Sequence, residues 1–144
     1  MSPSNEDGTV DVTFGENGIL LLDSSAKEVA ASSNIEDNKI IIATRYVSGL
    51  QLTLHKVDIS SGYDQSFGVN GILPLQTPSY YGVDQGVSNE LHSFDGVYQR
   101  NGKVFVLGST ITMPLGADGR KMLIRLSDSG NLDTDFGNQG FYFF

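Results

Sequence analysis

Residues 133–140 read Asp-Thr-Asp-Phe-Gly-Asn-Gln-Gly, and this motif occurs three times in the chain. The other copies are residues 11–18, Asp-Val-Thr-Phe-Gly-Glu-Asn-Gly, and residues 64–71, Asp-Gln-Ser-Phe-Gly-Val-Asn-Gly. Each copy is followed by a short apolar run: Ile19–Leu22, Ile72–Leu75 and Phe141–Phe144. A repeat with this spacing is typical of structural units that stack on one another. The motif therefore predicts architecture more directly than it predicts function.

Four positions of the motif are identical in all three copies: one aspartate, one phenylalanine and two glycines. Glycine permits the positive φ of a tight turn, and the aspartate can accept hydrogen bonds from nearby backbone amides. The phenylalanine stands among polar residues, so we expect it to be buried between adjacent units. We therefore interpret the motif as structural, with the residues Asp11, Phe14, Gly15, Gly18, Asp64, Phe67, Gly68, Gly71, Asp133, Phe136, Gly137 and Gly140.

The stretches between the copies predict strands in a repeated order. Lys39–Thr44 contains a run of β-branched residues, which is typical of a strand buried on both faces. Leu50–Val57 alternates apolar and polar residues, so we expect it to have one buried face. Asn101–Gly102 is a strong hairpin signal. Further strands are expected within Glu28–Asn34, Leu91–Tyr98, Lys103–Gly108 and Lys121–Leu126, and a buried strand over Phe141–Phe144.

Two repeat units result, about residues 23–75 and 76–144, after a partial unit at residues 8–22. The second unit is longer because of turn-like insertions within Gln76–Asn89 and Thr110–Gly119. This pattern predicts a single all-β, β-propeller-type domain with two four-stranded blades plus an N-terminal strand at Ile19–Leu22. A β-sandwich and an irregular barrel are the alternatives. Because propellers usually need about four to eight blades, we expect either an incomplete ring or an oligomeric head-to-tail ring.

The residues around the motif carry a resemblance to a known family. Gly102–Lys103–Val104 opens an apolar run, Ile124–Arg125–Leu126 follows it, and Ser129–Gly130–Asn131–Leu132 precedes the third motif. This combination resembles the delta-60 repeat, a bacterial β-propeller blade. Residues 102–140 are similar to the repeat, residues 38–71 form a weaker copy, and residues 8–18 keep only its end. The resemblance implies a propeller in a secreted or surface-attached protein, hence an extracellular or cell-surface location, and it implies no catalytic residue.

Composition excludes several functional classes. The 144-residue chain has no cysteine, which rules out disulfides, thiolate catalysis and cysteine–zinc sites. Its formal net charge of −8 disfavours binding to nucleic acid and to anionic membranes. No apolar run approaches the roughly 20 residues of a membrane helix, so no membrane insertion is expected. The first eight residues are polar and acidic, so no signal peptide is expected there.

The motif aspartates suggest two kinds of chemistry, and neither fits well. Asp133-x-Asp135 resembles the start of an acidic calcium loop. However, the other copies have Thr13 or Ser66 at the second position, Gly137 replaces the next ligand, and no closing glutamate follows. A pair of carboxylates could also serve a glycosidase, but an aspartate that recurs with every copy indicates fold geometry. We therefore predict a non-enzymatic protein with no metal and no cofactor.

Candidate ligand or partner contacts lie in or beside the insertion at Thr77–Gly86. Tyr80 and Tyr81 present flat apolar faces with polar tips, which suit stacking on a sugar or packing on a protein; packing within the blade is the alternative. His92 borders the insertion and is expected to be exposed, whereas His55 is expected at a half-buried or surface position of a strand. We predict a module for protein binding or assembly, through self-association or another protein. The alternative is a carbohydrate-binding module that uses residues 77–86.

Overall fold

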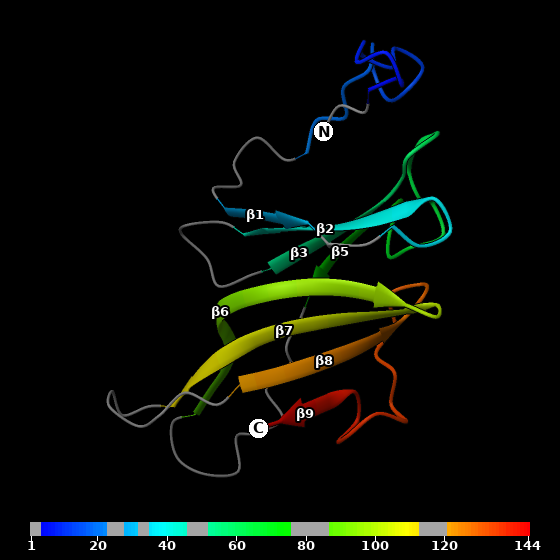
Figure 1. The fold of residues 1–144 in the computed structure, drawn as a ribbon. Helices are drawn as coiled ribbons and strands as arrows, with labels where there is room; N and C mark the ends of the chain where they lie inside the picture. Colours follow the sequence, from blue (N-terminus) through cyan, green and yellow to red (C-terminus); the bar gives the residue numbers. More distant parts are fainter. Residues whose placement is uncertain (1–3, 23–27, 32–34, 46–51, 76–86, 113–120) are drawn as a thin grey trace.

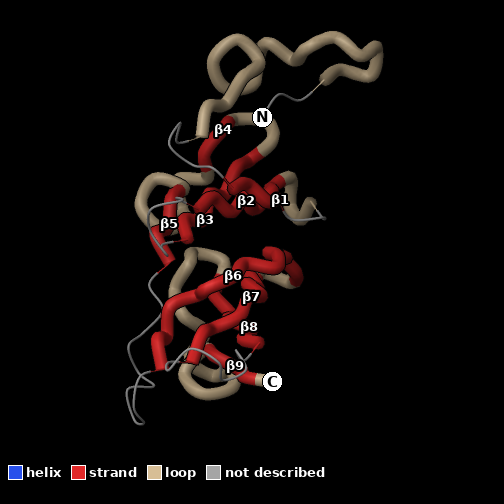
Figure 2. The backbone as a smooth tube through the Cα atoms, turned by 90° about the vertical axis from the view of Figure 1, so that its left-hand side faces the viewer, coloured by secondary structure: helices blue, strands red, loops and turns tan. Residues whose placement is uncertain are grey.

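The computed structural model describes residues 4–22, 28–31, 35–45, 52–75, 87–112 and 121–144. These ranges contain β-strands and turns and no helix. The strands form two antiparallel sheets that lie one over the other, with the N-terminal residues on the far side of the first sheet (Figure 1). Figure 2 shows the same stack after a quarter turn. The predicted all-β fold with two four-stranded blades is confirmed.

The first blade lies within residues 28–75. Its strands are β1 (Glu28–Ala31), β2 (Lys39–Arg45), β3 (Leu52–Asp58), β4 (Gly62–Tyr63) and β5 (Ile72–Leu75). The strands pair in the order β1–β2–β3, and β3 pairs with β4 at one end and with β5 at the other. The short β4 belongs to the turn that leads into the second motif. The four main strands of this blade are therefore β1, β2, β3 and β5.

The second blade repeats this order within residues 87–144. Its strands are β6 (Val87–Arg100), β7 (Lys103–Thr112), β8 (Lys121–Ser127) and β9 (Phe141–Phe143), and they pair in sequence order. Asn101 and Gly102 join β6 to β7 with φ values of 51° and 66°, as a tight two-residue hairpin requires. In the repeat, β7 corresponds to β2, β8 to β3 and β9 to β5.

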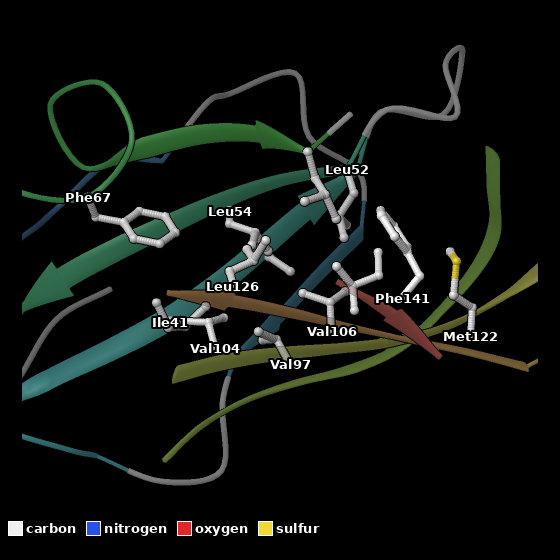
Figure 3. Packing of buried hydrophobic residues seen from close by; sticks show 13 residues of the cluster. Ile41, Leu52, Leu54, Phe67, Val97, Val104, Val106, Met122, Leu126 and Phe141 are labelled. Atoms are coloured by element: carbon white, nitrogen blue, oxygen red, sulfur yellow. The ribbon is translucent and has the colours of Figure 1, made fainter. Parts of the chain in front are cut away.

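The main hydrophobic core lies between the two blades (Figure 3). Ile41 of β2 and Leu54 of β3 enter it from the first blade, and Val106 of β7 and Ile124 of β8 enter it from the second. All four side chains are fully buried. The predicted two-sided burial of β2 is confirmed, since residues 41–44 are all buried. The shared core makes the two sheets one packed unit.

Two predictions about single segments are wrong. Ile19–Leu22 forms no strand, and only an isolated bridge joins Glu16 to Ile19. None of the described strands pairs with this run, so it lacks the hydrogen bonds of a sheet. The single buried face predicted for β3 is also wrong, because Leu52–Val57 is buried throughout. The second blade covers one face of β3, and the N-terminal residues contact the other.

The last apolar run is only partly buried. Phe141 is 5% exposed and lies in the core. Tyr142 is 50% exposed, and Phe144, which follows β9, is 68% exposed. The prediction of a wholly buried strand over Phe141–Phe144 is therefore wrong. The physical reason is that the outer face of the second blade is not covered by any described residues. The equivalent face of the first blade is covered by the second blade.

Candidate functional site

Each Phe-Gly motif folds into the same tight turn. In the second copy the Phe67 amide donates to the Asp64 carbonyl (3.1 Å), and the Gly71 amide donates to the Phe67 carbonyl (2.8 Å). The first and third copies make both bonds at matching positions. Gly68 has a φ of 54°, and a Cβ there would lie 2.4 Å from the carbonyl oxygen of Ile72. Only glycine fits at this position, so the turn itself explains the motif glycine.

The motif aspartates are held by partners close by. Asp64 accepts hydrogen bonds from the amide (3.1 Å) and the hydroxyl (2.6 Å) of Ser66, and it lies 2.9 Å from the Lys39 ammonium. Burial alone would raise the pKa of Asp64, but these partners lower it to about 2. The hydroxyl (2.6 Å) and amide (3.0 Å) of Thr13 likewise lower the pKa of Asp11. Both carboxylates are therefore ionised at neutral pH, which does not suit them to act as catalytic acids.

A cluster of cations, aspartate and phenylalanine joins the strands of the first blade to its motif. Lys39 opens β2, and Lys56 lies within β3. Their ammonium groups are 2.9 Å and 3.8 Å from the Asp64 carboxylate. Lys56 also lies over the ring of Phe67, 5.8 Å from its centroid, where a cation is attracted by the aromatic face. The motif turn is thus fixed to two strands by charge.

The second blade builds the same cluster. The ammonium of Lys103 and the guanidinium of Arg125 lie 2.8 Å and 2.9 Å from Asp133, and both lower its pKa. The Arg125 guanidinium lies 4.5 Å from the centroid of the Phe136 ring. No role was predicted for these basic residues from the sequence. The signal that could have found them is a basic residue at both positions of both units.

A turn of the second blade closes the cluster of the first blade. We call Asp128–Gly130 the docking turn. The Gly68 amide donates to the Ser129 carbonyl (2.9 Å). The Lys56 ammonium donates to the Asp128 carbonyl (3.1 Å) and pairs with its carboxylate. The Phe-Gly loop of one blade is therefore tied to the docking turn of the next.

Apolar packing completes this contact. Phe67 is fully buried and lies against Gly130, which has a φ of 92°. A Cβ at Gly130 would be 3.1 Å from the Phe67 ring and 3.1 Å from the Leu73 side chain, so a larger residue would force the blades apart. The phenylalanine of the motif thus lies between two adjacent units.

The N-terminal segment, residues 11–22, covers the other face of the first blade. Phe14 is fully buried there against Ile42 and Val57. Two leucines of the same segment pack beside it, Leu20 and Leu22. In the repeat, these three apolar residues correspond to Phe67, Leu73 and Leu75. The segment therefore contacts the first blade much as the first blade contacts the second.

The outer face of the second blade has no comparable cover among the described residues. Leu107 is 36% exposed, whereas Ala43, its counterpart in the first blade, is 1% exposed. An open apolar groove crosses this face, lined by Gly96, Tyr98, Arg100, Phe105, Leu107 and Leu123. We define the open face by the side chains of Tyr98, Phe105, Leu107, Leu123, Phe136 and Tyr142. It is the strongest candidate for an interaction site in the part of the chain that the structure describes.

The other candidate residues lie elsewhere. Tyr80 and Tyr81 are outside the described residues, and His92 lies in β6 with its side chain also outside them, so these contacts stay predictions. His55 was expected to be half-buried or at the surface, and this prediction is wrong, because the residue is only 2% exposed. Its Nε2 lies 2.9 Å from the Thr44 hydroxyl, and its Nδ1 lies 3.3 Å from the hydroxyl of Tyr63. These contacts place His55 in the packing of the first blade.

Comparisons with protein-family models, curated proteins and solved structures found no match. The resemblance to the delta-60 repeat therefore remains an expectation from the motifs. Within the described ranges, no three His, Asp or Glu side chains gather as a metal site would require. No helix in these ranges is long and apolar enough to span a bilayer.

Proposed function

We propose that this chain is a non-enzymatic repeat module that assembles with another protein subunit through its open face. The proposal rests on a difference between two equivalent surfaces: this face of the first blade is buried, and the same face of the second blade is exposed. Ile41 and Leu54 are fully buried where the second blade lies on the first. Phe105 and Leu123 occupy the same positions in the second blade and line an open groove. Contiguous exposed apolar surface of this kind marks interaction sites.

The chemistry of the open face supports a protein partner. Most side chains of the open face are aromatic. At the edge of this face, the Arg125 guanidinium lies over the ring of Phe136. Aromatic residues and arginine are enriched in protein interfaces and often contribute most of their binding energy. Phe136 is partly exposed, whereas its counterparts Phe14 and Phe67 are fully buried. A docked subunit would bury Phe136 in the same way.

The charged groups of the motif support a structural role over catalysis. The carboxylates of Asp64 and Asp133 are neutralised by cations from their own blades. Groups arranged in this way stabilise loops and leave no free base poised near neutral pH. The extracellular or cell-surface location implied by the family resemblance is part of this proposal.

The test is a variant that adds charge to the open face. Leu107→Glu places a carboxylate in the groove, and we expect it to weaken self-association by at least about tenfold because a charge must then be desolvated. Val69→Glu is the matched control, since Val69 is 74% exposed in the Phe-Gly loop of the first blade. Sedimentation equilibrium of both variants and the wild type measures the effect. Equal association constants for the two variants would contradict the proposal.

A further inference from the structure

The internal contact between the blades is a template for the partner of the open face. This inference rests on the proposed function and names its partner. In the template, the Phe-Gly loop of one blade packs on the docking turn of the next, and apolar side chains of the two sheets form one buried cluster. Whatever binds the open face in this way must supply a turn and an apolar sheet face. The first blade of this same chain has a turn closed by the hydrogen bond from Ser61 to Asp58, and an apolar face on which Ile42 and Val57 already pack against Phe14. Ser61 stands at the position of Gly130, so a docked Phe-Gly loop lies farther from this turn than in the template.

Charge complementarity supports the same partner. Within the chain, the Glu36 carboxylate accepts hydrogen bonds from the amides of Asn101 (2.5 Å) and Gly102 (3.3 Å) in the next blade. In the second blade Arg100 replaces Glu36, and it lines the groove of the open face. In the first blade Asp37 replaces Asn101. A first blade placed on the open face in the template arrangement therefore brings Asp37 to Arg100, an attractive pair.

We propose that the open face docks on the first blade of a second copy of this chain, displacing the N-terminal segment of that copy. The displacement is required because the receiving face is already covered. Ile42 and Val57 receive Phe14 there, as Val106 and Leu126 of the second blade receive Phe67. In the assembled pair, Phe136 of one copy takes the place of Phe14 of the other. The N-terminal segment is thus an exchangeable cap.

The contact between the two blades includes polar links beside its apolar core. Between the blades, Gly68 donates to Ser129, and Lys56 pairs with Asp128. Gly15 is the counterpart of Gly68, and over the described ranges its amide donates to no backbone carbonyl. Among the described residues, the cap packs on the blade through the apolar side chains of Phe14 and the leucines beside it. The incoming open face offers a phenylalanine at the same position together with the apolar surface of a whole sheet.

Single substitutions in the full chain test the exchange. Phe14→Ala weakens the cap, so it should strengthen self-association by at least about tenfold. Phe136→Ala removes the side chain that replaces Phe14, so it should weaken self-association by at least about tenfold. Leu21→Ala is the control, because Leu21 lies in the same segment but is 78% exposed. Its effect should be less than about twofold. Sedimentation velocity measures the association constant of each variant, and circular dichroism tests whether each variant is folded.

The outcomes separate this inference from the proposed function. If Phe136→Ala dissociates the assembly but Phe14→Ala leaves it unchanged or weaker, the cap is not exchanged and the partner surface lies elsewhere. If neither Phe136→Ala nor Leu107→Glu affects association, the open face is not the interface, and the proposed function fails as well.

A charge-exchange pair tests the partner independently of the cap. Arg100→Asp and Asp37→Arg each place like charges at the contact between copies, so each alone should weaken association by at least about threefold. A mixture of the two variants restores opposite charges at every contact between unlike copies. The mixture should therefore associate as tightly as the wild type. A mixture that associates no better than either variant alone would overturn the assignment of a second copy.

Discussion

At the scale of single residues, Gly130 decides how closely the two blades approach. Its φ of 92° and its contact with the Phe67 ring leave no room for a side chain. Gly130 lies outside the repeated motif, and Ser61 stands at its position in the first unit. Comparing the two units therefore did not single it out. The motif phenylalanine was predictable as a buried residue, but the residue that receives it was not.

Gly130→Ala should destabilise the protein more than Gly62→Ala. Both glycines have positive φ values, 92° and 102°, so each alanine adds about 1 kcal/mol of backbone strain. At Gly130 the methyl group also meets Phe67 and Leu73, which should cost about 1–2 kcal/mol more. A Cβ at Gly62 meets nothing within 4 Å. Urea denaturation measures both losses, and equal values would contradict close packing at the docking turn.

Asp64 gives the fold a defined pH dependence. Its pKa is about 2 in the folded protein, whereas an unfolded aspartate titrates near about 3.9. The stability from this group is therefore fully present above about pH 4 and is lost as the pH falls toward 2. Asp64→Asn should lower the free energy of unfolding by about 2 kcal/mol at pH 7, and by less at pH 3. Denaturation at both pH values tests this, and a difference from wild type that does not narrow with acid would refute it.

At the scale of elements, the segments with a strong local sequence signal could be predicted. The β-branched run of β2 favours a buried strand, and the Asn-Gly pair between β6 and β7 favours a tight hairpin. The second buried face of β3 was not predictable, because it depends on polar residues that the alternating pattern assigns to solvent. His55 lies on this face and is buried with Thr44, whereas Lys56 lies on the opposite face and is buried beneath the docking turn. Such partners come from other elements, so the strand sequence alone does not show them.

The three apolar runs after the motifs also depend on neighbouring elements for their structure. Ile72–Leu75 and Phe141–Phe143 form strands because β3 and β8 pair with them. Ile19–Leu22 has the same character, but none of the described strands pairs with it, and it stays irregular. Whether such a run becomes a strand depends on a neighbouring edge, which local composition does not specify.

The two equivalent cation clusters should differ in their contribution to stability. Lys56 is 2% exposed beneath the docking turn, whereas the side chain of Arg125 is 26% exposed on the outer blade. Lys56→Ala removes the buried ammonium that hydrogen-bonds to the Asp128 carbonyl, although Lys39 still pairs with Asp64, and it should cost about 2 kcal/mol. Arg125→Ala removes a pair that water already screens and should cost less than about 1 kcal/mol. Thermal or urea unfolding compares them, and an Arg125 effect as large as that of Lys56 would contradict the account.

At the scale of the whole molecule, three similar units stack in one direction. The N-terminal segment lies on the first blade, the first blade lies on the second, and the open face follows. The sequence predicted the number of blades, with either an incomplete ring or an oligomeric ring. It did not show which face stays uncovered, because that depends on strand register and on where each motif phenylalanine packs.

The central claim is that the open face binds a second copy, and the absolute mass in solution tests it most directly. Light scattering should be measured over a dilution series at low ionic strength and at about 0.15 M salt. Each copy carries a formal charge of −8, so salt should strengthen the association by screening repulsion between copies. We predict a mass above that of the 15.5 kDa chain at high concentration, falling to 15.5 kDa on dilution. A mass of 15.5 kDa at every concentration and both salt levels would contradict the account.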